Sequence, residues 1–346
     1  MAWPKSFDEG FDLRDYYLSN NHKPLKTLIG LKRFLEEPPP GTEGGEPLPE
    51  IIPDIFIEDK INRTETGNSN FLAKNFGDKI RFNHTTKQWH VWDGTRWKRD
   101  AVKQVREFAK QNAKKILELA WKLNDEDKKK NINWAVNSES RRIIDNTLSL
   151  TESVQGIGVE ETDFDQNPYL FNCNNGTFNF ETGKFQNHNP NDNISKKTEV
   201  DYIENAECPY WVESLDVMFK GDKKMIRFIQ RAIGLSLTGL TDEEALFFCY
   251  GEGKNGKSRF FDCIEMLLGD YYQKLPSEAL MFRKFDNTKE YHIATLSGSR
   301  FAVASEIDKY QRFNERVIRD LTGGDKLNAR FPYGRPFEFT PTHKLW

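Results

Sequence analysis

One octapeptide constrains this chain more than any other stretch. Residues 251–258, Gly-Glu-Gly-Lys-Asn-Gly-Lys-Ser, match the phosphate-binding pattern G-x-x-x-x-G-K-[ST] at every fixed position. The preceding residues 245–250 (ALFFCY) form a nearly continuous apolar run, which predicts a short buried strand. Apolar side chains then recur at helical spacing up to Gly269, which predicts a helix that starts at the loop. A strand, a glycine-rich loop and a helix start are the geometry that phosphate binding requires.

The octapeptide supplies the candidate nucleotide-binding residues. Its glycines allow backbone N–H groups to turn toward phosphate oxygens. Lys257 is expected to reach the β and γ phosphates, and the Ser258 hydroxyl to bind Mg²⁺. The predicted set is Gly251, Gly253, Asn255, Gly256, Lys257 and Ser258, with ATP and Mg²⁺ as the expected cofactors. The alternative is a glycine-rich turn that binds nothing, and the agreement of motif and flanks disfavours it.

Composition limits the remaining possibilities. The 50 basic and 53 acidic residues leave a net charge of −3, so nucleic-acid binding requires a local basic patch. No apolar run approaches the length of a membrane span, and the N-terminus lacks the layout of a secretory signal. Four scattered cysteines without a C-x-x-C motif predict reduced, buried thiols in a cytoplasmic protein: Cys173, Cys208, Cys249 and Cys263.

Composition and periodicity predict four segments. Residues 1–35 resemble the tail of an upstream domain, and residues 36–53 form a linker rich in proline, glycine and glutamate. Residues 54–205 form a mostly α module with small β hairpins, and residues 206–346 form an α/β domain around the octapeptide. In the α/β domain, helices between Cys208 and Leu235 are expected to cover the nucleotide-binding sheet.

The 54–205 segment offers two candidate nucleic-acid surfaces, and both have a simpler explanation. Trp89–Trp92 and Thr95–Lys98 flank Asp93-Gly94, which predicts a hairpin with a two-residue turn. The hairpin tryptophans could stack on bases, but packing in a core is favoured. Lysines on a helix predicted over residues 101–123 lie mostly off its apolar stripe, which favours a solvated helix face. A further helix is predicted over 133–150, and a small β element over 165–205.

A phosphate-binding loop needs a nearby carboxylate to support hydrolysis. Residues 300–308 (RFAVASEID) form an apolar strand that ends in an acidic turn. Glu306 is the predicted catalytic acid, with Asp308 as the second choice, since its distance along the chain suits another strand of the same sheet. An edge strand followed by an ordinary acidic turn is the alternative.

A basic and aromatic segment follows a helix predicted over residues 312–321. Lys326, Arg330 and Arg335 alternate with Phe331 and Tyr333 in a turn-rich stretch. Such interleaving suits contacts to a nucleic-acid backbone, although taken alone it is equally compatible with a solvated loop.

Together these motifs resemble a known family. GEGKNGKS, FAVASEID, LTGGDKLNAR and PTHKLW occur in this order at compact spacing, and WDGTRW, NGT and LTG precede them. The combination is similar to the superfamily 3 helicase module of phage and plasmid primase–helicases, a group that includes poxvirus-type relatives. The resemblance covers about residues 60 to 346.

The resemblance implies an AAA+-like P-loop ATPase that assembles as a ring, usually a hexamer, and moves along DNA during replication. It implies catalytic roles for Lys257 and Glu306, Mg²⁺ binding through Ser258 and Glu306, and DNA contacts at Lys326 and Arg330. Members often carry a second acid where this chain has Ser305. They also continue past the KLW segment to a polar sensor and an arginine finger, so the resemblance implies a chain truncated at its C-terminus. Gly10–Tyr17 weakly resembles the tail of a primase domain.

The sequence thus predicts an ATP-dependent DNA helicase of phage or plasmid replication, in the cytoplasm of a bacterial host. Two alternatives stay open. One is a DNA-binding replication-initiation or assembly module with a silent ATPase, and the other is an unrelated P-loop switch ATPase such as a defence protein.

Overall fold

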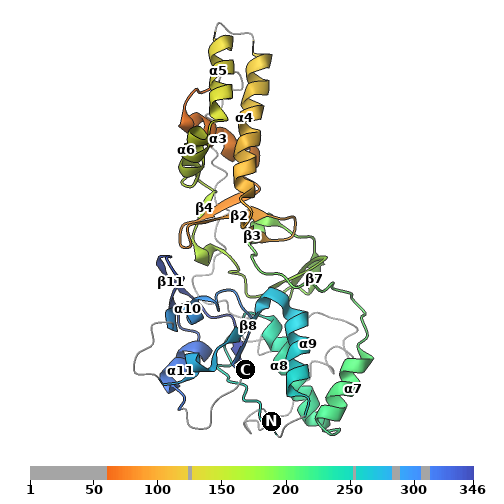
Figure 1. The fold of residues 1–346 in the computed structure, drawn as a ribbon. Helices are drawn as coiled ribbons and strands as arrows, with labels where there is room; N and C mark the ends of the chain where they lie inside the picture. The colour runs from red at the N-terminus through yellow and green to blue at the C-terminus, as the bar shows by residue number, and fades with distance from the viewer. Residues whose placement is uncertain (1–60, 124–126, 252–254, 283–288, 305–311) are drawn as a thin grey trace, which may run out of the picture. The chain divides into compact units, whose positions relative to one another are not determined.

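The computed structural model describes residues 61–123, 127–251, 255–282, 289–304 and 312–346. The described residues divide into two compact units, one within Glu43–Asp163 and one within Phe164–Trp346. The segments predicted over 1–35 and 36–53 lie outside the described residues, and the predicted junction at 205/206 stays a prediction. Both units mix helices with small sheets (Figure 1). No helix of the described ranges is long and apolar enough to cross a membrane.

The Glu43–Asp163 unit packs helices against a small sheet with the strand order β3-β2-β1-β4. Its elements are α3 (Glu65–Phe76), β1 (Ile80–Asn83), β2 (Gln88–Trp92), β3 (Trp97–Arg99), α4 (Gln104–Lys122), α5 (Lys128–Ser138), α6 (Arg141–Thr151), β4 (Gly158–Val159) and a 3₁₀ turn at Glu161–Asp163. Helices α4 and α5 lie side by side (Figure 1). The helix predicted over 133–150 is in fact two helices, since Ser140 starts α6 as its N-cap.

The predicted hairpin is present, but its turn is longer than two residues. Trp92 pairs with Trp97, so the loop spans Asp93–Arg96. The Asp93 carboxylate accepts hydrogen bonds from the backbone N–H groups of Thr95 and Arg96 at 2.8 and 2.9 Å, which stabilises the wider loop. The backbone closes the same loop, since the Asp93 N–H donates to the Arg96 carbonyl at 3.1 Å.

The structure agrees with core packing for the hairpin tryptophans and with a solvated helix face for the lysines of α4. Trp97 is fully buried, and Trp89 packs edge-to-face on Phe82 at 5.0 Å between ring centroids. On α4, Lys110 pairs with Glu107 at 2.7 Å. These side chains therefore belong to the core and to a solvated helix face.

The second unit contains a parallel sheet, two antiparallel sheets and the helices around them. Its elements are β5 (Leu170–Cys173), β6 (Gly176–Asn179), β7 (Lys184–Gln186), α7 (Pro209–Met218), α8 (Lys223–Leu237), α9 (Lys257–Leu268), β8 (Tyr272–Leu275), α10 (Lys289–Ala294), β9 (Phe301–Ala304), α11 (Glu315–Thr322), β10 (Leu327–Arg330), β11 (Pro336–Phe339) and β12 (Lys344–Leu345), with 3₁₀ turns at Pro190–Asp192, Gly269–Tyr271 and Ser277–Leu280. The predicted small β element is the β5-β6-β7 sheet.

The parallel sheet has the order β12-β9-β8. Leu246 adds one parallel bridge to Leu345, and Phe247 N–H donates to the Leu345 carbonyl at 2.9 Å. The prediction of a strand over 245–250 is therefore wrong in length, because this is the only bridge that these residues form with the described part of the chain. Phe247 is buried, whereas Phe248 and Tyr250 are about half exposed, which a fully buried strand would not allow.

The two faces of this sheet pack against different cores. Phe301 and Val303 of β9 belong to a core shared with α8 and α9, whereas Ala302 belongs to a core shared with α11 and β10. The alternation follows from the two-residue period of a strand. Trp346 extends the first core by stacking on Phe247 and Phe301, at 4.2 and 4.7 Å between ring centroids.

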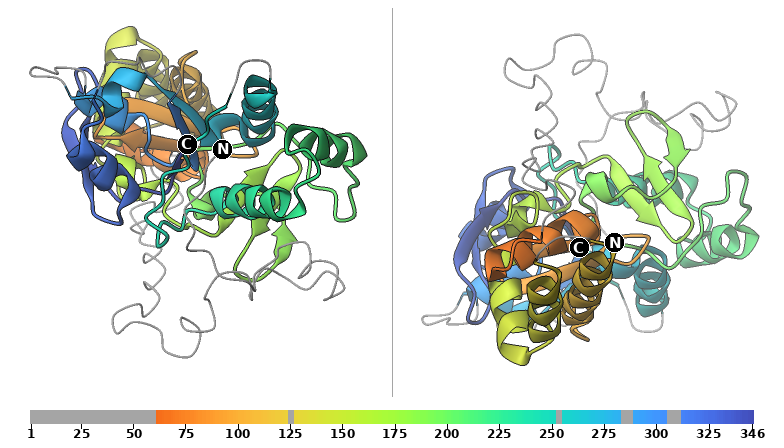
Figure 2. Two further views of the ribbon diagram at one scale, coloured as in Figure 1. Left: turned by 90° about the horizontal axis from the view of Figure 1, so that it is seen from below. Right: turned by 90° about the horizontal axis from the view of Figure 1, so that it is seen from above.

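Helix α8 packs beside the β5-β6-β7 sheet (Figure 2), and buried residues of both share the first core. Two buried cations fasten these elements to the parallel sheet. The Arg300 guanidinium, at the start of β9, donates to the carbonyls of Asn167 and Leu170 at 3.2 and 3.4 Å. The Lys344 ammonium, on β12, donates to the carbonyl of Thr238 at 2.6 Å, where α8 ends.

The exposure of two cysteines contradicts the prediction that all four thiols are buried. Cys173 is buried, and burial raises the pKa of its thiol to about 11. Cys208 and Cys263 are exposed, so the prediction of buried thiols is wrong for these two. Cys263 lies on the outer face of α9, where the helical period places it away from the sheet.

We expect Gly239→Ala to destabilise the second unit, because a Cβ there would lie 1.5 Å from Nη1 of Arg300 and 2.9 Å from Cα of Pro168. Forced overpacking of this kind costs about 1–3 kcal/mol of unfolding free energy. Urea denaturation followed by tryptophan fluorescence measures the loss. Gly324→Ala is the control, because nothing lies within 4 Å of a Cβ built there. Equal midpoints for the two variants would contradict the packing described.

Candidate nucleotide and nucleic-acid site

The loop that precedes α9 has the backbone geometry of a helix start. Gly256 is the N-cap of α9, with φ of 86° in the left-handed region that favours glycine. Lys257 and Ser258 are the first two residues of the helix. Residues 252–254, including the predicted Gly253, lie outside the described residues. The chain thus changes direction at Gly256 and presents the side chains of Lys257 and Ser258 at the first helical turn.

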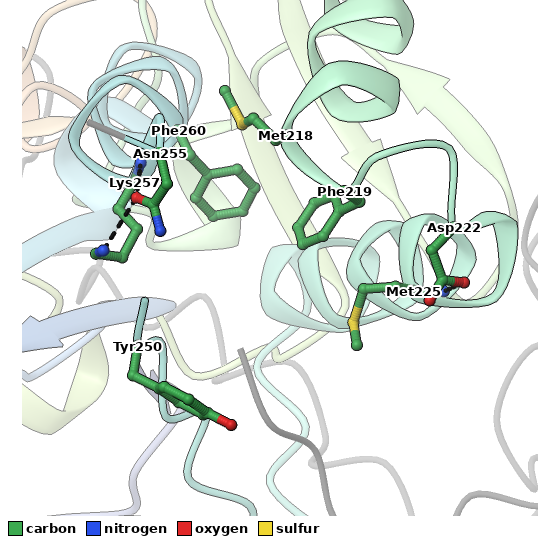
Figure 3. A pocket seen from close by; sticks show the side chains of 8 residues that line it. All are labelled: Met218, Phe219, Asp222, Met225, Tyr250, Asn255, Lys257 and Phe260. Atoms are coloured by element: carbon green, nitrogen blue, oxygen red, sulfur yellow. Dashed lines mark hydrogen bonds between the residues drawn. The ribbon is translucent and has the colours of Figure 1, made fainter. Parts of the chain in front are cut away.

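Within the loop, Lys257 is held by the loop itself. Its ammonium donates to the Gly251 carbonyl at 2.8 Å and to Oδ1 of Asn255 at 2.9 Å. The Asn255 amide lies directly over Gly251, because a Cβ on that glycine would approach Nδ2 of Asn255 to 2.3 Å. Asn255 therefore links Gly251 and Lys257, and it helps to hold the Lys257 ammonium against the loop (Figure 3).

The N-terminus of α9 is open to an anion. Its N-cap, Gly256, has no side chain, and Asn255 Oδ1 accepts from the Lys257 N–H only at 3.4 Å, in contrast to α8, where the Asp222 carboxylate accepts from the N–H groups of Lys224 and Met225. The first N–H groups of a helix lack intrahelical partners, and the helix dipole adds positive potential at that end. With Lys257 beside them, these groups form a site that suits a phosphate. The exposed Ser258 offers a hydroxyl oxygen next to it.

The predicted catalytic acid lies outside the described residues, but the end of its strand is described. β9 ends at Ala304, whereas Ser305, Glu306 and Asp308 fall in the range that follows it. β9 runs parallel to β12, and β12 pairs in parallel with Leu246. Ala304 therefore lies at the same edge of the sheet as the run that leads into Gly251, with β12 between them.

The basic and aromatic segment is a β hairpin. β10 and β11 pair from Leu327 with Phe339 to Arg330 with Pro336. Leu327 and Ala329 are buried in the second core, whereas Asn328 and Arg330 are exposed, as the two-residue period requires. The predicted helix before it is α11, shifted to Glu315 because Asn314 caps its first turn.

The tip of this hairpin gathers an aromatic ring and two cations. Tyr333 is 98% exposed and has a φ of 62°. The Arg330 Nε donates to the Gly334 carbonyl at 3.3 Å, and the exposed Arg335 follows directly in the chain. A closed turn from Phe331 to Gly334 positions these side chains.

The hairpin separates the two predicted DNA-binding residues. Arg330 lies at the tip, whereas Lys326 precedes the opposite end of β10, beside Asp325. The exposed Glu338 opposes Asn328 on the strands between them. The strongest positive potential of this segment therefore lies at the tip. Tyr333 was visible in the sequence as one aromatic of the segment, but only the turn geometry distinguishes it from the partly buried Phe331.

Comparisons with known proteins agree on one kind of relative. Residues 69–220 match the family described as D5 N terminal like. The chain is 27% identical over 277 residues to Putative helicase L207/L206 of Acanthamoeba polyphaga mimivirus, an alignment that covers 77% of this chain and 29% of that protein. It is 25% identical over 308 residues to Putative helicase 121R of Invertebrate iridescent virus 3, with 74% and 32% covered.

A shorter match points in the same direction. Over 129 residues the chain is 30% identical to Putative helicase 022R of Frog virus 3, covering 36% of this chain and 13% of that protein. The chain thus spans about a third or less of the length of these curated relatives. The matches confirm the resemblance to a primase–helicase family of the D5 type.

We expect Asn255→Ala to release the Lys257 ammonium from its hydrogen bond to the Asn255 amide oxygen. A net hydrogen-bond contribution of about 1 kcal/mol corresponds to a roughly fivefold faster reaction of this amine with acetic anhydride. Mass spectrometry of pulse-labelled protein measures the rate at Lys257, with the exposed Lys326 as the internal reference. An unchanged Lys257 rate would mean that the Asn255 contact does not hold the ammonium.

Proposed function

We propose that this chain, a homologue of viral primase–helicases of the D5 type, is the part of a DNA helicase that binds Mg-ATP and contacts DNA during replication. The observation that carries the proposal is the loop before α9. There Gly256, Lys257 and the first N–H groups of α9 lie together at one edge of a parallel sheet. This arrangement supports a P-loop NTPase domain of the AAA+-like kind, an assignment that is part of the proposal.

The residues of the loop fit a nucleotide with its magnesium ion. Lys257 and the first N–H groups of α9 would hold the phosphates, and the Ser258 hydroxyl would provide an oxygen ligand for Mg²⁺. The bound ion would neutralise charge on the phosphates. Glu306 is proposed as the residue that orients the attacking water and supports the ion, on sequence grounds alone.

The β10–β11 hairpin is the proposed DNA contact. Its exposed tip combines a ring that can stack on a base with guanidinium groups that can bind phosphates. The helicase names of the relatives motivate DNA as the polymer. Self-association into a ring, with six subunits as the first expectation, belongs to the same proposal because it would place several hairpins around one strand.

We expect Lys257→Ala to abolish ATP binding, because it removes the positive charge at the loop. Isothermal titration calorimetry with Mg-ATP measures the affinity, and Lys184→Ala on the exposed strand β7 is the matched control.

In the same assay we expect Glu306→Gln to keep wild-type affinity, while ATP turnover measured by phosphate release is lost. Normal turnover by Glu306→Gln would mean that another residue is the catalytic acid. ATP turnover that single-stranded DNA does not stimulate would favour a switch ATPase over a helicase.

We expect substitutions at the hairpin tip to distinguish the contribution of charge to DNA affinity from the contribution of base stacking. Arg330→Ala or Arg335→Ala weakens single-stranded DNA binding. It also makes the negative slope of the log association constant against log salt concentration shallower, by about 0.7 for each DNA phosphate that the variant no longer neutralises. Tyr333→Ala weakens binding by about 1–3 kcal/mol without changing that slope. Fluorescence anisotropy across a salt series measures both quantities.

Lys184→Ala serves again as the charge control for the hairpin series. Lys326→Ala has a smaller effect than Arg330→Ala, because Lys326 lies at the other end of the hairpin. Wild-type affinity and slope in all three tip variants would exclude the hairpin as the DNA contact.

A further inference from the structure

The outward face of α7 carries large apolar side chains. Leu215 is buried in the first core and so determines which side of the helix faces inward. Tyr210 and Val217 are seven residues apart, which places them together on the opposite side, where they are 83% and 74% exposed. Ile203, shortly before the helix, is exposed as well. Apolar side chains gathered on one exposed face are typical of an interaction surface.

The charges around this face are all negative. Residues 198–219 contain six acidic side chains and no basic one: Glu199, Asp201, Glu204, Glu207, Glu213 and Asp216. Two of them pair with lysines outside this segment. Glu213 is exposed on the outward face of α7 itself. Such a surface repels a nucleic acid, so the partner that it suits is a protein surface that is both apolar and basic.

Residues 312–320, which include α11, carry the opposite excess of charge. Burial of Val317 and Leu321 in the second core turns Arg316 and Arg319 outward, and both arginines are exposed. With the exposed Arg312, this stretch has three arginines against two acidic residues. The outward face of α11 therefore supplies the basic groups that the α7 face lacks.

Two exposed aromatic rings accompany these arginines. Phe313, just before α11, contacts Phe248 edge to face, with 6.4 Å between the ring centroids. The two side chains are 36% and 47% exposed. Apolar and basic groups thus occur together on this side of the second unit, as a complement to the α7 face requires.

The two faces lie on opposite sides of the second unit. Leu215 of α7 packs in the first core and Val317 of α11 in the second, and these cores cover opposite faces of the parallel sheet. Figures 1 and 2 show the two helices well apart, with α8 and α9 between them. One copy therefore cannot join its own two faces, whereas two copies can. A contact of this heterologous kind repeats head to tail and forms a ring if the rotation closes.

We propose that the outward face of α7 in one copy binds the outward face of α11 in a second copy of this chain. This inference rests on the proposed function, because it names the surfaces through which the proposed ring assembles. Glu213 then faces Arg316 and Arg319, and the apolar side chains of α7 pack against Phe313.

Sedimentation velocity of the full chain over a concentration series, without and with Mg-ATP, measures the association. We expect Glu213→Arg and Arg319→Glu each to raise the concentration of half-association roughly tenfold, because each places like charges opposite one another. An equimolar mixture of the two variants regains wild-type association, since each reversed charge again meets an opposite one. The double variant does the same. A variant that had merely misfolded is not rescued by mixing.

The matched controls are Glu118→Arg and Lys184→Glu, which reverse exposed charges outside both surfaces, on α4 and β7. Both controls associate like the wild type. Tyr210→Ala weakens association at low and high salt alike, whereas the effect of Glu213→Arg shrinks as salt screens the charges.

The outcomes separate this inference from the proposed function. A wild-type chain that stays monomeric under all conditions, or single variants that mixing does not rescue, overturns the interface. Loss of single-stranded DNA affinity in Arg319→Glu, in a chain that stays monomeric, would assign α11 to DNA instead. If Lys257→Ala still abolishes ATP binding in these cases, the nucleotide site stands without the interface. If the charge reversals behave as expected but Lys257→Ala binds ATP normally, the interface stands and the proposed nucleotide site fails.

Discussion

Two buried cations hold together the parts of the second unit that the site requires. Arg300 directly precedes β9 and donates to carbonyls before and within β5, and Lys344 on β12 donates to the carbonyl of the C-cap of α8. Burial lowers the pKa of both side chains, that of Lys344 well below its ordinary value. A buried charge is costly unless hydrogen bonds and dipoles compensate it, and Lys344 donates to the Thr238 carbonyl at the C-terminus of α8, where the helix dipole is negative. Displacing α8 or β12 would remove that compensation, so their positions are strongly constrained.

Local signals in the sequence were enough for the elements that begin the site. The G-x-x-x-x-G-K-[ST] pattern and the apolar period after it predicted α9 correctly, and the FAVA run predicted β9. Both signals lie within one element and need no distant partner. By contrast, β12 has only two residues and is held between β9 and Leu246 by backbone pairing with both. No periodicity can appear in two residues, so the strand that separates the loop from β9 was not predictable.

The hairpin shows the same limit at the level of single residues. Composition identified a basic and aromatic segment, but it could not tell which residues form its tip. Pairing of Arg330 with Pro336 fixes the turn, and the turn exposes Tyr333 while Lys326 falls at the other end. Register is set by Leu327, Ala329 and Phe339, which pack in the second core against side chains far away in the chain. The Trp-rich hairpin of the other unit differs in the same way, because the Asp93 carboxylate selects a wider loop.

The alternation along β9 joins the two proposed surfaces physically. Phe301 and Val303 contact the core that supports α9 and its loop, and Ala302 between them contacts the core that supports the β10–β11 hairpin. Protein cores are packed at the density of organic crystals, so a strand cannot shift without repacking both sides. Any movement of β9 that accompanies nucleotide binding at its edge would therefore also displace side chains in the core that supports the hairpin. In the proposed helicase, this shared strand is a route by which the state of the nucleotide could alter how Tyr333 and Arg330 bind DNA.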